Sequence, residues 1–99
     1  MITVHVFLQC RPDSREEFIA ALEALQASTL AEDSGCLHYR FYADLEDPTR
    51  FVCVEEWTDK ASLDAHLSAG HHVSGSARID RYRAREAELR VFESEPVDL

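Results

Sequence analysis

CLHYRFYADLEDPTRFVCVEEW, residues 36–57, predicts an antiparallel β-hairpin. Between Cys36 and Tyr42 the side chains alternate with a period of two, which is typical of a strand. A polar segment with a proline follows at residues 45–50, and residues 51–57 are then rich in β-branched and aromatic side chains. Because two such runs joined by a short turn form a hairpin, we expect these two strands to pair antiparallel.

On the N-terminal side of this hairpin the sequence predicts a strand and then a helix. Residues 2–9, ITVHVFLQ, have the β-branched and aromatic composition of a strand. Ser14 and Glu17 have the spacing of a capping box, and the apolar residues after them recur at helical spacing. We therefore expect a helix over residues 15–32 that ends at the segment Asp33-Ser34-Gly35.

On the C-terminal side the sequence predicts two helices and a last strand. Thr58 or Asp59 can cap a short helix over residues 60–69. Residues 72–87 have a partial apolar stripe, and we expect a third helix there. Residues 89–92 are expected to form the last strand.

These elements follow the order β-α-β-β-α-β, the split βαβ arrangement of ferredoxin-like α+β folds, with helices on one face of an antiparallel sheet. We expect a single domain over residues 1–99, in which the acidic end, residues 94–99, frays. The strand at 51–57 carries apolar groups on both faces, so both faces should be covered. Helices can cover one face, and the sheet of a second protomer most simply covers the other, which predicts a homodimer.

The composition argues against several kinds of partner. The formal charge of −9, from nineteen acidic residues against ten Lys and Arg, repels nucleic-acid phosphates and anionic lipids. No apolar run approaches the roughly 18 residues of a membrane span, and the N-terminus lacks the features of a signal peptide. We expect a soluble, cytoplasmic protein with no nucleic-acid or membrane partner.

The three cysteines, Cys10, Cys36 and Cys53, are odd in number and widely spaced, so we expect buried free thiols.

Several short motifs occur in a fixed order along the chain: Asp33-Ser34-Gly35-Cys36-Leu37-x-Tyr39, Asp47-Pro48-x-x-Phe51, Glu55-x-Trp57, Ala65-His66-Leu67 and His71. In this combination the chain resembles the antibiotic biosynthesis monooxygenase superfamily, and most closely its small quinol-monooxygenase-like members. The resemblance covers nearly the whole chain. It implies a dimeric α+β barrel with a pocket in each protomer between the sheet and the helices.

The activities implied by this resemblance are diverse. Members of the superfamily include cofactor-free oxygenases of polyketide phenols and quinols, haem-degrading enzymes and an isomerase of a signalling sugar phosphate. The haem-degrading and aromatic-polyketide branches use an asparagine with a tryptophan in the pocket, whereas this chain contains no asparagine. This departure argues against haem degradation, and it leaves the polyketide-type mechanism without one of its polar groups.

We expect His66 and Glu55 to be the catalytic residues. His66 lies on the inward face of the helix at 60–69, where burial would hold the imidazole neutral and available as a base. Glu55 lies in mid-strand between apolar neighbours, which is costly for a charge unless it is paired. We expect its partner to be His66 or a group of the second protomer, and a purely structural ion pair is the alternative.

The aromatic side chains that we expect to bind substrate are Trp57, Tyr39, Phe51, Phe41 and His5. Trp57 is the only tryptophan and offers a large flat surface with one donor, which suits an aromatic ligand. Tyr39 and Phe41 share one face of their strand, and His5 lies in the middle of the first strand. The alternative for each of them is simple packing.

Three histidines, His66, His71 and His72, also suggest a metal site. Ligands on one helical turn are three or four residues apart, whereas His66 and His71 are five apart across a glycine, and no HExxH motif accompanies them. We therefore expect no metal, and the absence of a Gly-rich phosphate loop predicts no nucleotide cofactor.

The leading hypothesis is a cofactor-independent monooxygenase that oxidises quinols or polycyclic phenols with O2, so that the partners are a small aromatic substrate and O2. Triplet oxygen reacts with such a substrate once deprotonation lets it give up an electron, and His66 would be the general base. The alternatives are a proton-transfer isomerase of a small polar ketone and a non-catalytic dimeric module for ligand binding.

Overall fold

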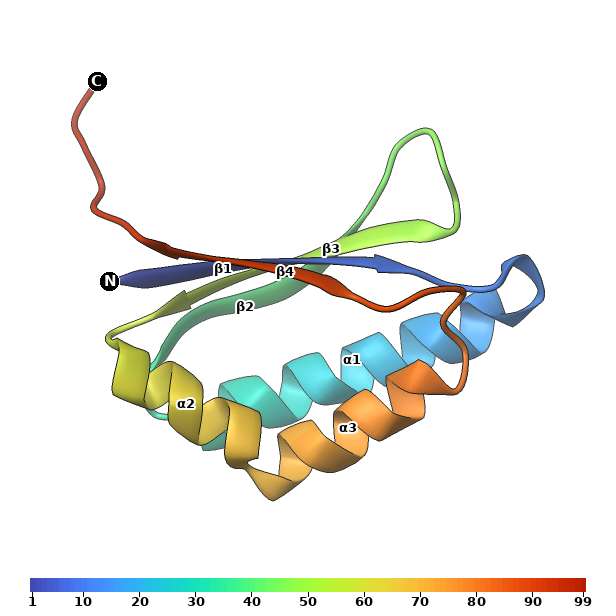
Figure 1. The fold of residues 1–99 in the computed structure, drawn as a ribbon, viewed down its shortest axis with the longest axis horizontal. Helices are drawn as coiled ribbons and strands as arrows, with labels where there is room; N and C mark the ends of the chain where they lie inside the picture. Colours follow the sequence, from blue (N-terminus) through green and yellow to red (C-terminus); the bar gives the residue numbers. More distant parts are fainter.

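The computed structural model describes all residues 1–99, and its elements follow the order predicted from the sequence (Figure 1). Four strands form one sheet: Ile2–Gln9 (β1), Cys36–Ala43 (β2), Arg50–Trp57 (β3) and Glu88–Glu93 (β4). The helices are Arg15–Glu32 (α1), Lys60–Ser68 (α2) and Gly70–Asp80 (α3), and a short 3-10 turn, Pro12–Ser14 (η1), precedes α1. The predicted ferredoxin-like α+β fold is therefore confirmed. None of the helices has the length and hydropathy of a membrane span.

The sheet has the strand order β2-β3-β1-β4, and every neighbouring pair is antiparallel. β2 and β3 form the hairpin that the sequence predicts, with Tyr39 opposite Glu55. Val4 of β1 lies opposite Glu55 on the other side of β3. The central position of β3 thus places Glu55 between two neighbouring strands rather than at an edge.

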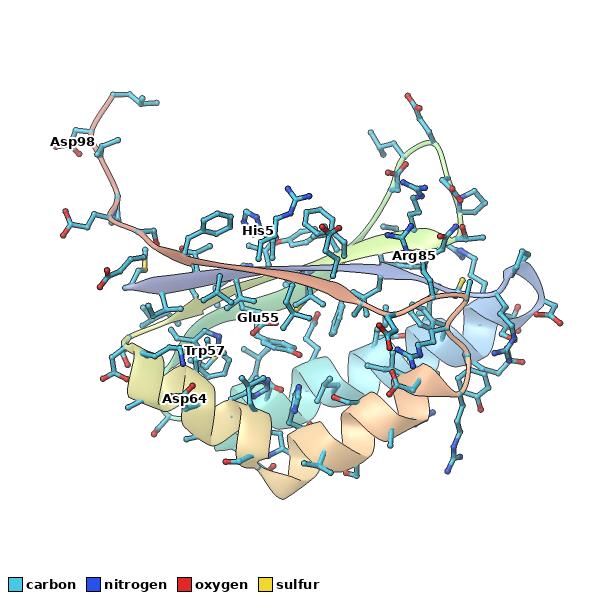
Figure 2. All side chains as sticks on the ribbon, in the orientation of Figure 1. His5, Glu55, Trp57, Asp64, Arg85 and Asp98 are labelled. Carbon is cyan, nitrogen blue, oxygen red and sulfur yellow. The ribbon has the colours of Figure 1, made fainter.

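All three helices lie on one face of the sheet, and the other face is open in the single chain (Figure 1). In β3, alternate residues from Phe51 to Trp57 point toward the helices and are buried. His5 of β1 projects from the open face, as Figure 2 shows. Its ring lies near Phe7 and Phe92, with centroid separations of 6.4 and 5.4 Å.

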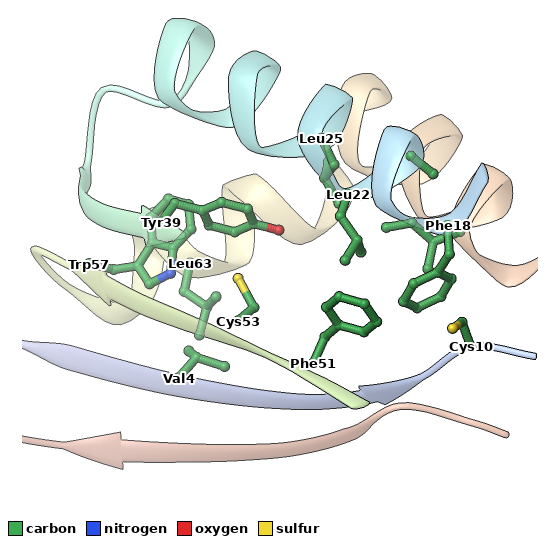
Figure 3. Packing of buried hydrophobic residues seen from close by; sticks show 12 residues of the cluster. Val4, Cys10, Phe18, Leu22, Leu25, Tyr39, Phe51, Cys53, Trp57 and Leu63 are labelled. Carbon is green, nitrogen blue, oxygen red and sulfur yellow. The ribbon is translucent and has the colours of Figure 1, made fainter. Parts of the chain in front are cut away.

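The core fills the space between α1 and the sheet and continues under α2 (Figure 3). At one end Phe18 of α1 packs against Phe51 of β3, with ring centroids 5.5 Å apart. At the other end Tyr39, Trp57 and Leu63 are buried together. The candidate site lies at this second end.

The start of α1 differs from the prediction in its capping. Ser14 is the residue before the helix, but its side chain makes no capping hydrogen bond. Its hydroxyl instead donates to Asp13 and accepts from the guanidinium of Arg11. The capping box is therefore absent, because the preceding 3-10 turn directs the Ser14 side chain to neighbouring charged groups. The expected cap of α2 is present, since the Asp59 carboxylate accepts a hydrogen bond from the backbone N–H of Ser62 at 2.8 Å.

The third helix is shorter than predicted. α3 covers Gly70–Asp80, whereas the apolar pattern predicts a helix over residues 72–87. Beyond Asp80 the chain turns back to the end of β1, where the backbone N–H of Ala84 donates to the carbonyl of Gln9 at 2.8 Å. Pairing with a segment far away in the sequence therefore ends the helix, and a local pattern does not contain that information.

Two glycines are required by close approaches, since no residue has a positive φ. A Cβ on Gly35 would collide with the side chain of Ser62 at the start of α2. A Cβ on Gly75 would lie 2.9 Å from Cδ1 of Leu25, so this glycine lets α3 pack closely against α1. Both approaches hold the helices over the sheet in the region of the candidate site.

Candidate functional site

A cavity of about 190 Å³ lies between the sheet and the helices α2 and α3. Its wall is mostly apolar, and its acidic and histidine residues are Glu55, His66, His72 and Asp80. A larger hollow of about 310 Å³ lies beside the β2-β3 loop, but it contains no histidine and its charged residues are Asp44, Arg50 and Arg85. The smaller cavity is the better candidate because buried groups that can move protons line it.

His66 is almost fully buried in the last turn of α2, and Asp33 fixes its orientation. The distance from His66 Nδ1 to Asp33 Oδ2 is 2.6 Å. Desolvation raises the pKa of Asp33, but hydrogen bonds from His66 and His71 outweigh it and leave this pKa below the ordinary value. Asp33 is therefore an anion, and it accepts a hydrogen bond from the Nδ1–H of His66.

This hydrogen bond leaves Nε2 of His66 as the ring nitrogen with a free lone pair, and no protein group bonds to it. Burial lowers the pKa of His66, and the bond to Asp33 offsets that effect only in part. The imidazole is thus neutral at pH 7. A buried carboxylate that fixes the tautomer of a neutral histidine is the arrangement that a general base needs.

The neighbouring histidines are engaged at both ring nitrogens. His72 also lines the cavity, with Nδ1 3.2 Å from the carbonyl of Leu67 and Nε2 3.2 Å from the hydroxyl of Ser76. Since a carbonyl only accepts, Nδ1 of His72 carries the proton and its Nε2 accepts from Ser76. Of the two histidines that line the cavity, His66 is therefore the one that offers an unengaged nitrogen.

His71 lies behind His66 and does not line the cavity. Its Nε2 is 2.8 Å from Oδ2 of Asp33, and its Nδ1 is 3.0 Å from Oε2 of Glu32. The rings of His66 and His71 have centroids 5.8 Å apart. Two histidines from different helices therefore share one carboxylate oxygen.

Glu55 lines the cavity from β3, and its partner is Trp57 rather than His66. The indole Nε1–H of Trp57 donates to Oε1 of Glu55 at 3.1 Å. Burial raises the pKa of Glu55 to about 7, although hydrogen bonds from Trp57 and Cys53 act in the opposite direction. The expectation of an ion pair between Glu55 and His66 is therefore wrong, because Asp33 occupies the position beside His66.

Of the expected aromatic residues, Tyr39 and Phe41 line the cavity, with ring centroids 5.6 Å apart. Trp57 is completely buried and does not line it. The indole lies against the imidazole of His66 instead, with ring centroids 4.6 Å apart (Figure 2 shows Glu55 and Trp57 on this side of the sheet). Trp57 thus packs against the ring of His66 and donates a hydrogen bond to Glu55, without itself lining the cavity.

Two further residues that were expected to bind substrate, Phe51 and His5, lie outside the wall of this cavity. Phe51 points toward the helices but packs in the core against Phe18, outside the wall of this cavity. His5 lies on the opposite face of the sheet, because neighbouring residues of a strand point to opposite sides and Val4 and Val6 line the cavity. Neither residue can touch a ligand in this cavity within one chain.

The sequence places Asp33 in a helix stop and in a motif of the family resemblance, but it does not identify Asp33 as a residue of the site. It lies 33 residues from His66 in the chain, and the turn after α1 brings it beside α2.

The burial of one cysteine differs from the prediction. Cys10 and Cys53 are buried as expected, whereas Cys36 is partly exposed, and desolvation raises its pKa to about 11.

The model of the family described as "Antibiotic biosynthesis monooxygenase" matches residues 1–78 of the chain. The chain is 31% identical over 82 residues to Rv0793 of Mycobacterium tuberculosis, covering 83% of this chain and 79% of that protein. It is 28% identical over 85 residues to the uncharacterized protein sll1783 of Synechocystis sp.. That match covers 86% of this chain but 57% of sll1783, so the chain spans little more than half of that relative.

Solved structures agree with the fold over nearly the whole chain. A structure described as antibiotic biosynthesis monooxygenase superposes with a TM-score of 0.89 at 25% identity, covering 97% of this chain and all of that one. A conserved protein from Methanosarcina mazei Go1 superposes with a TM-score of 0.89 at 29% identity, covering 95% and 92%. The structure of Rv0793 has a TM-score of 0.84 and covers 99% of this chain and 96% of its own.

Proposed function

The chain belongs to the antibiotic biosynthesis monooxygenase family, and from that premise we propose that it oxidises small quinols or related phenols with O2 and without a cofactor. The observation that carries this proposal is the Asp33 and His66 pair at the wall of an apolar cavity. His66 Nε2 is the general base, and Asp33 is the positioning residue that holds the tautomer.

The reaction begins when Nε2 of His66 removes the proton of a substrate hydroxyl. The resulting anion gives one electron to O2, and the radical pair combines to form a C–O bond. The peroxide then loses water: the O–O bond breaks, and the departing oxygen takes two protons, one returned by protonated His66 and one released from that carbon, which becomes a carbonyl. A hydroquinone and O2 thus become a hydroxyquinone and water, and the substrate supplies all the electrons.

Glu55 is the second polar group of the cavity wall. With a pKa of about 7 it carries a proton in a large fraction of molecules near neutral pH, and it can then donate a hydrogen bond. Its oxygen Oε1 already accepts from Trp57, so the other oxygen is the one that can contact the substrate. We assign Glu55 the role of stabilising a carbonyl or peroxide oxygen while His66 holds the abstracted proton.

The size and lining of the cavity favour a small aromatic substrate. A volume of about 190 Å³ is below the roughly 300–1,000 Å³ typical of sites for drug-sized ligands, which favours one or two rings over larger polycyclic phenols. The rings of Tyr39 and Phe41 supply an aromatic wall, and apolar residues of β1 and β4 complete it. Such a lining also excludes bulk water from a reactive peroxide.

The two alternative functions receive less support from this geometry. A small polar ketone with a phosphate or carboxylate requires a cation, but no Lys or Arg lines the cavity and two acidic residues do. A purely structural role would have Glu55 and His66 satisfy one another, whereas their partners are Trp57 and Asp33. The free Nε2 of His66 is better explained by a ligand.

The working unit in this proposal is a homodimer joined through the open face of the sheet. Val52 and Val54 of β3 and Phe7 of β1 lie on that face, and Phe92 of β4 is 44% exposed there. No helix covers these side chains in the single chain (Figure 1). A stable interface of this kind buries more than about 1,200 Å² in total.

Turnover with and without oxygen tests the proposed reaction. A one-ring and a two-ring quinol are incubated with protein under air and under nitrogen, and the rate without protein is subtracted. We expect oxygen-dependent formation of the hydroxyquinone, lost in His66→Ala. Turnover of the quinol that continues at the same rate under nitrogen contradicts the proposal, because no oxygen is then consumed.

A further inference from the structure

We propose that Asp33, His66 and His71 form a binding site for a divalent transition-metal ion such as Zn²⁺, on the side of His66 that faces away from the cavity. The oxygen Oδ2 of Asp33 lies 2.6 Å from Nδ1 of His66 and 2.8 Å from Nε2 of His71. The three candidate ligand atoms all lie within 4.8 Å of one another. One carboxylate and two imidazoles are ligands that suit Zn²⁺.

The break between α2 and α3 brings the two histidines together. α2 ends at Ser68, Ala69 is extended with ψ 144°, and α3 begins at Gly70. His66 and His71 therefore lie on two helices that meet at an angle, not on one continuous helix. The spacing rule for ligands on a single helical turn therefore does not apply to these two histidines. That rule was the main reason for which the sequence predicts no metal.

The arrangement requires only a small expansion to hold the ion. Zinc bonds of about 2.0–2.2 Å in tetrahedral geometry separate neighbouring ligands by about 3.3 Å. The present distances from Oδ2 of Asp33 to the two ring nitrogens, 2.6 and 2.8 Å, are those of hydrogen bonds, so each nitrogen must move away from this oxygen by well under 1 Å. In the absence of metal, these hydrogen bonds keep the three ligand atoms facing one another.

A second carboxylate is placed as the outer partner of a metal-bound histidine. His71 offers Nε2 to the site, and its other nitrogen, Nδ1, lies 3.0 Å from Oε2 of Glu32. Ligating histidines almost always donate their second N–H to such a group, which fixes the ring and raises its basicity. Asp33 and His71 are only 13% and 14% exposed, whereas Glu32 is 59% exposed at the surface. The ion would therefore enter from the Glu32 side.

Metal binding would change the chemistry of the cavity, a consequence that rests on the proposed function. When Nδ1 of His66 binds the ion, the single proton of the neutral ring can no longer reside on Nδ1 and is carried by Nε2 instead. The nitrogen that faces the substrate then donates and can no longer accept a proton. Zn²⁺ is therefore expected to inhibit the oxygenase reaction reversibly, and the reaction itself needs no metal.

Titration calorimetry of untagged protein with ZnCl2, in the absence of substrate, tests the site directly. We expect one Zn²⁺ per chain, and no binding of Mg²⁺, which prefers oxygen ligands. His71→Ala should weaken binding by at least about 100-fold, since losing only an outer partner costs about 10–100-fold. Glu32→Gln, at an exposed position, should weaken it by about 10-fold. His38→Ala is the matched control, because His38 bonds to Tyr42 on the open face and should not contribute.

Several outcomes overturn the proposal: no stoichiometric Zn²⁺ in the wild type, equal affinity in His71→Ala, or loss of affinity in His38→Ala. Circular dichroism checks that each variant is folded. If His71→Ala does not fold, an unchanged affinity in Glu32→Gln contradicts the site. Because binding is measured without turnover, a protein that binds Zn²⁺ but oxidises no quinol refutes the proposed function and leaves the metal site standing.

Discussion

Replacing Glu55 by glutamine should make the protein less sensitive to alkaline pH. Glu55 is 4% exposed and lacks a cationic partner, and burial raises its pKa from 4.5 to about 7. A carboxyl whose pKa is higher in the folded state favours folding when protonated. The wild type therefore loses stability as the pH rises from about 4.5 to about 7, and the loss is complete above pH 7.

The magnitude follows from the size of this shift. Each pKa unit corresponds to 1.36 kcal/mol, so a rise from 4.5 to about 7 amounts to about 3 kcal/mol between the acidic and alkaline limits. Between pH 5 and pH 8 the expected change is about 2–3 kcal/mol, because part of the effect is already present at pH 5. Glutamine cannot ionise, and its oxygen can still accept from Trp57.

Other titrating groups beside Glu55 do not disturb this interval. Cys36, Cys53 and Tyr39 interact with Glu55, and burial raises the pKa of each of them, so they stay protonated between pH 5 and pH 8. His66 shares the cavity wall, and burial lowers its pKa, so it is neutral over most of the interval. These groups are also present in the variant, so their contributions cancel in the difference.

Urea denaturation of the wild type and Glu55→Gln, at pH 5 and pH 8 and at one protein concentration, measures the effect. The free energy of unfolding of the variant, relative to that of the wild type, should increase by about 2–3 kcal/mol from pH 5 to pH 8. Glu56→Gln, on the opposite face of β3, controls for the loss of one negative charge. If the difference in the free energy of unfolding between Glu55→Gln and the wild type does not change with pH, Glu55 is not a buried carboxyl with a raised pKa.

Three other changes have defined outcomes. His66→Ala should lower quinol turnover by about 10²–10⁴-fold while the protein stays folded, and a folded variant with full activity contradicts the role of the base. Gly35→Ala should lower the free energy of unfolding by about 1–3 kcal/mol in urea denaturation, because its Cβ would collide with Ser62; unchanged stability contradicts the close approach. Val54→Glu should convert the dimer to a monomer in sedimentation equilibrium, because it places a charge on the open face of the sheet; a wild type that is already monomeric refutes the dimer.

The sequence predicts the secondary structure well where local patterns determine it. The hairpin of residues 36–57 and the limits of α1 agree with the structure, because strand alternation and helical spacing are local properties. α3 ends early because the next residues pair with the end of β1, and the capping box fails because nearby charges bind Ser14. Both differences arise from contacts that no short window of sequence contains.

The candidate site was predictable only in part. His66 and Glu55 were identified because a histidine and a carboxylate on apolar faces are unusual, and both do line the cavity. Their partners could not be predicted, since Asp33 reaches His66 only through the path of the chain after α1. The position of Trp57 behind His66, rather than in the cavity wall, likewise depends on how α2 packs over β3.

The most direct test of the central claim is oxygen consumption during quinol oxidation, measured with an oxygen electrode on wild type and His66→Ala prepared in the same way. We expect the wild type, without added cofactor, to consume O2 and form hydroxyquinone in equal amounts, well above the rate of spontaneous oxidation. The rate of His66→Ala should fall to or near the spontaneous rate. Equal rates in wild type, variant and buffer would contradict the claim that this cavity and its histidine catalyse the reaction of O2 with a quinol.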